Sequence, residues 1–132
     1  MAASHPIIIH DERSLAAAVL EATRVAQSAG LSRVAVQQLA TVTSELGRNI
    51  LKYAVRGRIQ LEAIERKGRK GVRVVASDKG PGIQEVERAM ADHYSTGGTL
   101  GLGLSGTKRM MDEFTVMSEP GKGTRVEVVK WQ

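Results

Sequence analysis

One segment places an acid and a tight glycine turn directly after an apolar stretch. Residues 71–77 read Gly-Val-Arg-Val-Val-Ala-Ser, and Asp78 and the turn Gly80-Pro81-Gly82 follow. The two glycines allow backbone conformations closed to other residues and let a ligand approach the main chain. A carboxylate at the end of a buried strand requires hydrogen-bond donors, which the exocyclic amine of a flat heterocycle would supply. The alternative is an ordinary strand-to-helix connection that Asp78 begins.

A second group of polar residues lies on a predicted helix. Glu45 and Asn49 are four residues apart and share one helix face, with Gln38 and Lys52 on the same rim. The amide oxygen of Asn49 is a hard ligand that suits Mg²⁺, which takes few protein ligands, and Lys52 would face phosphate oxygens. Glu45 could accept a proton from an attacking hydroxyl or water. With Gly47, which costs about 1 kcal/mol relative to alanine in a helix, this row suits a metal–phosphate site; the alternative is a solvated helix edge.

Two glycine-containing segments follow later in the chain. Four glycines lie in residues 97–104, directly before a predicted helix, where free N–H groups can hold phosphate and glycines can form a mobile lid. There is no P-loop sequence and no dinucleotide fingerprint, so a flexible loop is the alternative. The second segment, 121–124, is fully explained as a hairpin turn. Thr124 has a functional role only if it enters the final strand beside Asp78. Its hydroxyl could there support the carboxylate directly or through a water.

The first half of the chain predicts a strand and two helices that would position these residues. Residues 6–10 form the strand, and Asp11 and Ser32 are the helix N-caps. The first helix ends at Gly30, and the second runs to about Ala54. The apolar face of the first helix comprises Leu15, Val19, Ala22 and Ala26, and that of the second comprises Leu39, Val42, Leu46, Ile50 and Tyr53.

The second half predicts mainly strands. Alternating residues form strands over 57–63 and 71–77, joined by a hairpin turn at 67–70. Short helices are expected over 84–91 and 104–113, and a last hairpin pairs 115–118 with 124–131. The pattern predicts one α+β domain over residues 1–132, with helices on one face of a mixed, largely antiparallel sheet.

Composition limits the function classes. The 132 residues suffice for one core, and the sequence lacks a long apolar run, so we expect no membrane span and no secretory signal. The absence of cysteine excludes disulfides and thiolate metal sites and suits a cytoplasmic protein. A net charge of +5 favours anionic partners. Four aromatic residues are too few for a base-stacking nucleic-acid binder.

The order of these segments resembles one family. Glu-x-x-x-Asn on a helix, Asp-x-Gly-x-Gly after a strand, Gly-x-Gly before a helix and Gly-x-Gly-Thr in a terminal hairpin are similar to the N, G1, G2 and G3 boxes of the GHKL ATPases and kinases. The resemblance spans about residues 37–131. It implies the two-layer α/β sandwich of that family.

The resemblance also implies roles for individual residues. Asp78 would accept the adenine amine of ATP or ADP, with Thr124 near the adenine. Glu45 would be the general base, and Asn49 would bind Mg²⁺. The remaining nucleotide-binding residues would be Lys52, Gly80, Gly82, Gly98, Gly101, Leu102 and Gly103.

Among small stand-alone members, two bacterial branches are similar to this chain. The segments 43–50, 94–98 and 108–114 look most like the RsbT-type switch kinases of the stressosome. These phosphorylate STAS-domain proteins on serine or threonine and, once released, activate a PP2C-type phosphatase. The RsbW and SpoIIAB type of anti-sigma factor, which binds a sigma factor and phosphorylates an STAS-domain antagonist, is the next most similar. A glycine at position 47 departs from the alanine expected there.

Two interpretations from other classes stay open. One is a nucleotide-gated binding module without turnover, against which Glu45 argues, because such a module needs no base. The other is nucleic-acid binding through a basic patch, although a solvated edge that discourages strand pairing is the favoured explanation. That patch comprises Arg56, Arg58, Arg66, Lys67, Arg69, Lys70 and Arg73.

Overall fold

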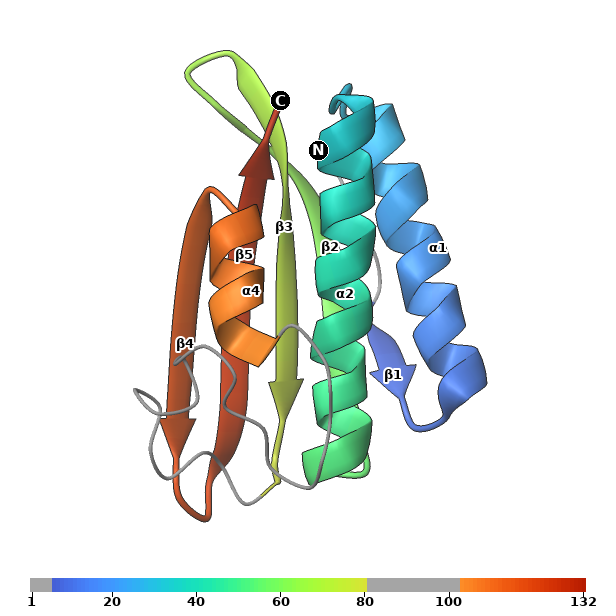
Figure 1. Ribbon diagram of the computed structural model, residues 1–132, viewed down its shortest axis with the longest axis vertical. Helices are drawn as coiled ribbons and strands as arrows, with labels where there is room; N and C mark the ends of the chain where they lie inside the picture. The colour runs from blue at the N-terminus through green and yellow to red at the C-terminus, as the bar shows by residue number, and fades with distance from the viewer. Residues whose placement is uncertain (1–5, 81–102) are drawn as a thin grey trace.

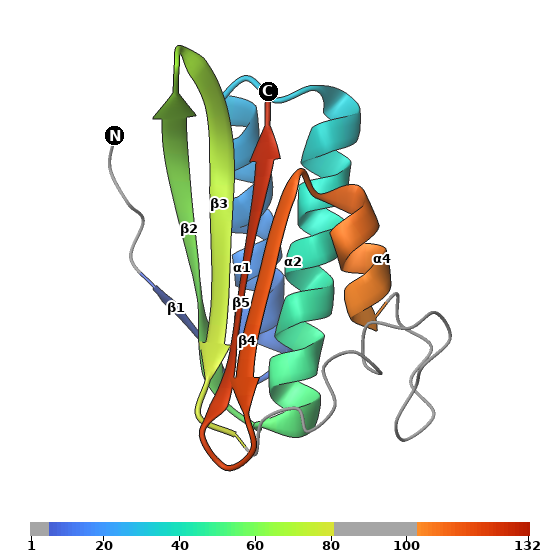
Figure 2. The same ribbon diagram turned by 90° about the vertical axis from the view of Figure 1, so that its left-hand side faces the viewer.

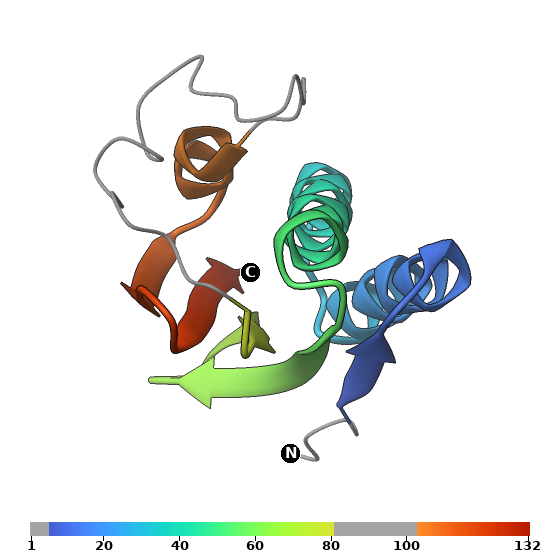
Figure 3. The ribbon, with the colours of Figure 1, turned by 90° about the horizontal axis from the view of Figure 1, so that it is seen from below.

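A computed structural model describes residues 6–80 and 103–132 of the chain. Three described helices cover one face of a five-stranded sheet, which gives two layers (Figures 1 and 3). They are α1 (Glu12–Ser28), α2 (Arg33–Tyr53) and α4 (Gly103–Met110). The predicted α+β class is therefore confirmed.

The sheet places the last strand of the chain in its interior. The strands are β1 (Ile7–Ile9), β2 (Gly57–Arg66), β3 (Arg69–Asp78), β4 (Glu113–Glu119) and β5 (Gly123–Trp131). Their order is β1-β2-β3-β5-β4, so β5 lies between β3 and β4 (Figure 2). Every pairing among the described strands is antiparallel, whereas the sequence predicted a mixed, largely antiparallel sheet.

The predicted helix caps are confirmed. The Asp11 carboxylate accepts a hydrogen bond from Ser14 N–H at 2.8 Å, and Ser14 Oγ accepts one from Asp11 N–H at 3.1 Å. This reciprocal pair forms a capping box. Ser32 Oγ accepts from Ala35 N–H at 3.1 Å at the start of α2. Both helices thus begin where side-chain oxygens satisfy their first N–H groups.

The β2–β3 hairpin is longer than predicted. Its turn consists only of Lys67 and Gly68, both with positive φ, of 54° and 78°. Two such residues match the twist of the flanking strands. The pairing therefore continues up to Arg66 and Arg69, which the sequence assigned to the turn or its flank.

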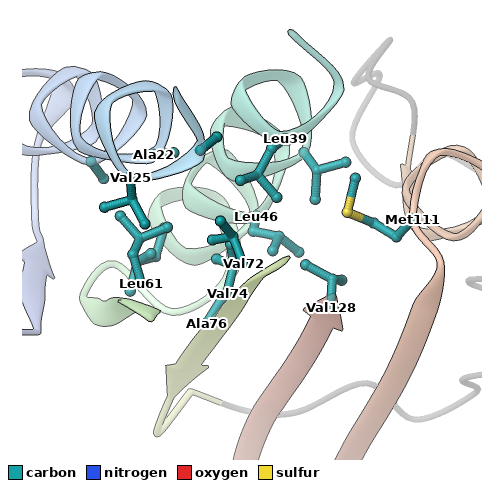
Figure 4. Close-up of a cluster of buried hydrophobic side chains, with 14 of the residues drawn as sticks. Ala22, Val25, Leu39, Leu46, Leu61, Val72, Val74, Ala76, Met111 and Val128 are labelled. Atoms are coloured by element: carbon teal, nitrogen blue, oxygen red, sulfur yellow. The ribbon is translucent and has the colours of Figure 1, made fainter. Parts of the chain in front are cut away.

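The core lies between the helices and the sheet (Figure 4). On α2, Leu39, Val42, Leu46 and Ile50 are buried as predicted. Two residues that the sequence placed on the apolar helix faces are not buried in the core. Val19 is only half-buried, because the buried stripe of α1 runs through Ala18 and Val25 instead. Tyr53 is 46% exposed, because it is the last residue of α2 and its ring faces Lys52 Nζ at 5.1 Å.

The last predicted helix is shorter than expected. α4 ends at Met110, and β4 begins at Glu113, which pairs with Val129. Asp112 accepts a hydrogen bond from Trp131 N–H at 2.7 Å, which fixes the start of the hairpin. The predicted helix over 84–91 lies outside the described residues. Within the described part of the chain, none of the helices has the length and hydropathy to cross a membrane.

Candidate functional site

Three elements that carry predicted site residues end or begin at the same end of the molecule. β3 ends at Asp78, α2 ends at Tyr53, and β5 begins at Gly123, all toward the lower end in Figures 1 and 2. A Cβ added to Gly80 would lie 2.7 Å from Ala54 Cβ, the C-cap of α2. The turn after β3 therefore packs directly against the end of α2. This contact connects the Asp78 region with the polar rim of α2.

The polar rim of α2 carries three predicted residues along one side of the helix. Glu45 is buried, with 9% of its surface exposed, and no hydrogen bond or ion pair ties its carboxylate to another described residue. Asn49 is half-buried one turn further on, and Lys52 is exposed with its ammonium over the Tyr53 ring. A carboxylate without a cation partner is a competent proton acceptor. The rim thus offers an acid, an amide oxygen and a cation in succession.

Asp78 is held between two neighbouring strands. It pairs with Gly57 of β2 on one side and with Thr124 of β5 on the other. Asp78 Oδ1 accepts a hydrogen bond from Gly80 N–H at 2.8 Å. This bond orients the carboxylate, and because no hydrogen bond joins Oδ2 to another described residue, Oδ2 can accept from a ligand donor.

Gly123 brings the last hairpin against the Asp78 main chain. Its φ is 104°, and a Cβ there would lie 2.2 Å from Asp78 O and 2.9 Å from Lys79 Cα. Because these are backbone atoms that cannot rotate away, only glycine fits this position. The sequence explained this glycine by the hairpin turn alone. The structure adds a packing reason, because the turn at Gly123 lies directly against the main chain of Asp78, which carries the carboxylate.

Thr124 lies in β5 beside Asp78. This is the position at which the sequence predicts that its hydroxyl supports the Asp78 carboxylate. Its Oγ1 lies 2.9 Å from Ser118 Oγ on β4, and Ser118 Oγ also donates to Gly123 O at 3.2 Å. Ser118 was missed by the sequence reasoning. The predicted turn over residues 119–123 already makes Ser118 and Thr124 the first facing pair of the hairpin, so register counting could have found it.

The glycine-rich segment is described only at its end. Gly103 is the first residue of α4, so a helix does begin directly after the glycines, as predicted. Leu104 and Thr107 of this helix are buried, and the helix packs against α2. Gly82, Gly98, Gly101 and Leu102 lie outside the described residues.

The basic patch is partly neutralised by acids on other strands of the sheet. Arg73 forms an ion pair with Glu62 at 2.9 Å, and Arg66 forms one with Glu113 at 3.2 Å while packing over the Trp131 ring at 5.0 Å. These pairs cross the sheet and give two of the arginines a structural role. The patch is therefore weaker as an anion-binding surface than its composition indicates.

Comparison with known proteins gives the family. Residues 9–130 match the histidine kinase-like ATPase domain. The serine/threonine-protein kinase RsbT of Bacillus subtilis (strain 168) is 44% identical over 107 residues, which cover 81% of this chain and 80% of that protein. The anti-sigma F factor of Thermoanaerobacter sp. (strain X514) is 30% identical over 101 residues, covering 73% and 70% of the two chains.

A solved structure supports the fold independently. The mycobacterial sensor histidine kinase MprB superposes with a TM-score of 0.59 over 96% of both chains, at 18% sequence identity. At that identity the likeness concerns the fold alone. The family match over nearly the whole chain and the sequence identity to RsbT go further and show the family. The chain belongs to the histidine kinase-like ATPase family, and within it is similar to RsbT and to the anti-sigma F factors.

Proposed function

We propose that this protein is an ATP-dependent protein serine/threonine kinase. It phosphorylates STAS-domain proteins in a partner-switching pathway that controls a bacterial sigma factor, and on release it activates a PP2C-type phosphatase. The observation that carries the proposal is the meeting of the α2 rim with the Asp78 turn through Ala54 and Gly80. That contact supports a single site that contains Asp78 as the proposed acceptor of the adenine amine and Glu45 as the proposed general base. The 44% sequence identity to a serine/threonine-protein kinase supports phosphoryl transfer to serine or threonine as the reaction.

The residues present fit the nucleotide. Asp78, oriented by Gly80 N–H, would accept the adenine amine through Oδ2. Lys52, near the end of α2, would contact phosphate oxygens. We further propose that Gly82, Gly98, Gly101, Leu102 and Gly103 surround the phosphates and the base.

The donor set also fits Mg²⁺. The described residues contain no group of three or more His, Cys, Asp or Glu side chains that could hold a metal. Mg²⁺ takes one or two protein ligands and fills its remaining positions with waters and phosphate oxygens, so Asn49 suffices as the protein ligand. When bound, the ion would neutralise charge on the phosphates.

The proposed chemistry is direct transfer of the γ-phosphoryl group. A serine or threonine hydroxyl of a docked partner attacks the γ-phosphorus, and the bond to the β–γ bridging oxygen breaks. Glu45 accepts the hydroxyl proton, because its carboxylate has no cation partner among the described residues and the rest of the residue is buried. N–H groups of the glycine-rich segment stabilise the charge that develops. The pathway would place the protein in the cytoplasm.

The test is transfer of labelled γ-phosphate from ATP–Mg²⁺ to a purified STAS-domain protein from the same organism. Asp78→Asn should abolish labelling, because asparagine replaces one of the two acceptor oxygens by an NH₂ donor and so cannot accept from both Gly80 N–H and the adenine amine. Asp112→Asn is a matched control, since Asp112 lies at the other end of the sheet and an asparagine oxygen can still accept from Trp131 N–H. No label on the partner while ATP still binds would favour the nucleotide-gated binding module. No ATP binding would overturn the assignment.

One alternative has specific support. The similarity to anti-sigma F factors favours a kinase of the same chemistry that also binds a sigma factor directly. Purification of the protein in a stable complex with a sigma factor would support that alternative. Purification with large STAS-domain assemblies would support the switch kinase.

A further inference from the structure

Three side chains form a row across the sheet at the candidate adenine site. Ser118 of β4 pairs with Thr124 of β5, and Thr124 pairs with Asp78 of β3. Directly opposed residues of antiparallel strands present their side chains on the same face, about 5 Å apart at Cβ. The two hydroxyl oxygens are 2.9 Å apart, which is hydrogen-bonding distance. The row thus links Ser118 to Asp78 through Thr124.

The direction of the hydroxyl bond follows from counting protons. Each hydroxyl has one proton to donate. Ser118 Oγ lies 3.2 Å from Gly123 O, and a carbonyl oxygen can only accept, so Ser118 donates there. Either hydroxyl is within range to donate to the other, and with the Ser118 proton assigned to Gly123 O the bond between the two hydroxyls uses the proton of Thr124. Hydroxyl hydrogens are assigned from such networks.

This assignment turns the Thr124 proton away from Asp78. Thr124 Oγ1 then offers only lone pairs to the site. Asp78, with Oδ1 already accepting from Gly80 N–H, is also an acceptor when ionised. The wall formed by these two residues accepts hydrogen bonds and donates none from its side chains.

We infer that Ser118 is a positioning residue for base specificity. By accepting the hydrogen bond that Thr124 donates, Ser118 leaves the side chains of Asp78 and Thr124 as hydrogen-bond acceptors only toward the ligand. Adenine carries an exocyclic amine that donates, whereas guanine carries the acceptor O6 at the equivalent position. Ser118 therefore strengthens the preference for adenine nucleotides that Asp78 begins. This inference rests on the proposed nucleotide site.

A purely structural role for Ser118 makes a different prediction. If Ser118 only held the hairpin through Gly123 O, its loss would weaken the binding of adenine and guanine nucleotides to the same extent. If Ser118 sets the direction of the Thr124 proton, its loss would free Thr124 to donate. Guanine nucleotides would then bind relatively better. The ratio of the two affinities separates the roles.

The experiment measures the dissociation constants of ADP and GDP by calorimetry for the wild type and three variants. Ser118→Ala should lower the ratio of ADP to GDP affinity by about three- to tenfold, the effect of one redirected hydrogen bond. Ser118→Thr retains the hydroxyl and should keep the wild-type ratio. Thr115→Ala, an exposed β4 position, is the matched control and should leave the ratio unchanged.

Each outcome is decisive. An unchanged ratio in Ser118→Ala, with ADP still bound, would overturn the inference and leave the proposed function intact. A wild type that binds no ADP would overturn both. If Ser118→Ala does not fold, Ser118→Cys replaces it, because a thiol keeps the shape and is a weak donor and acceptor. It should lower the ratio in the same direction, and an unchanged ratio would again overturn the inference.

Discussion

Gly47 of α2 lies directly against Leu15 of α1. A Cβ added to Gly47 would come 2.1 Å from Leu15 Cδ1 and 3.6 Å from Ile59 Cδ1. The sequence interpretation counted this glycine with the neighbouring ligand-binding rim. The structure gives it a packing role instead, because it lets the two long helices approach each other over the sheet. This also explains the departure from the alanine expected at this position.

Gly47→Ala should destabilise the protein by about 1 kcal/mol. Overpacking typically costs about 1–3 kcal/mol, and the better helix propensity of alanine returns about 1 kcal/mol. The free energy of unfolding in urea measures the difference. In a Leu15→Ala background the clash is gone, so the same substitution should stabilise the protein by up to about 1 kcal/mol. An equal effect in both backgrounds would contradict the packing explanation.

Gly123→Ala should be far more damaging than Gly121→Ala. Both glycines have positive φ, 104° and 80°, but a Cβ at Gly121 would meet nothing within 4 Å. Gly121→Ala should therefore destabilise by only about 1 kcal/mol, the cost of the left-handed conformation. Gly123→Ala should destabilise by more than about 2 kcal/mol and should weaken ADP binding by more than about tenfold, because it pushes on Asp78. Similar ADP affinities in the two variants would contradict the proposed link between the hairpin and the site.

Glu45→Gln should separate binding from turnover. Glutamine keeps the size of the side chain but cannot accept the proton, so the rate of phosphoryl transfer should fall by about 10²–10⁴-fold. ATP affinity should change little, since Glu45 is not proposed to contact the nucleotide in its ground state. Single-turnover transfer and calorimetry provide the two measurements, with Glu65→Gln, at an exposed position of β2, as the control. Full activity in Glu45→Gln would rule out its role as the base.

The Asp11 cap should make stability depend on acid pH. The pKa of Asp11 lies below its usual value of 3.8, chiefly because Ser14 N–H donates to the carboxylate and secondly because of the Ser14 side chain. A lowered pKa in the folded state means that the stabilisation is complete above pH 3.8 and is lost as the pH falls through the folded pKa. Urea unfolding of wild type and Asp11→Ala should differ by a constant amount near neutral pH and converge below pH 3.8. A difference that stays constant below pH 3.8 would contradict the prediction.

Val55→Gly should stabilise the protein. Val55 follows the C-cap of α2 with φ 68° and is 74% exposed, a conformation that is strained for a β-branched residue. Glycine adopts it freely, and we expect a gain of about 1 kcal/mol in the free energy of unfolding. Leu20→Gly, at a 72% exposed position within α1, should instead lose about 1 kcal/mol. A loss of stability in both variants would contradict the backbone strain at Val55.

Local signals predicted most of the elements. The caps at Asp11 and Ser32 and the apolar stripe of α2 fixed the helices, because these interactions join residues three or four apart. The end of α4 at Met110 was missed, since Glu113 joins the sheet through its pairing with Val129. The order of the strands was not predicted either, because it depends on pairings between segments far apart in the chain.

The motif residues of the candidate site could be found from sequence, but their supports could not. Residue type and order identified Asp78 and Thr124, whereas the contact of Gly80 with Ala54 depends on how the end of α2 meets the sheet. The approach of Gly123 to Asp78 O depends on the register between β3 and β5. Such contacts arise only when separate elements pack, so composition and periodicity carry no trace of them.

The interior position of β5 has a consequence for biosynthesis. Asp78 is translated well before its partner Thr124, and until β5 emerges from the ribosome the edge of β3 that it covers has no neighbour. A nascent chain that has made α1, α2, β2 and β3 would therefore expose an unpaired strand edge ending in Asp78, the proposed acceptor of the adenine amine. Because the proposed adenine site includes Thr124 of β5, nucleotide binding would await residues 123–131, and nucleotide would not assist the early stages of folding. It can stabilise only the finished sheet.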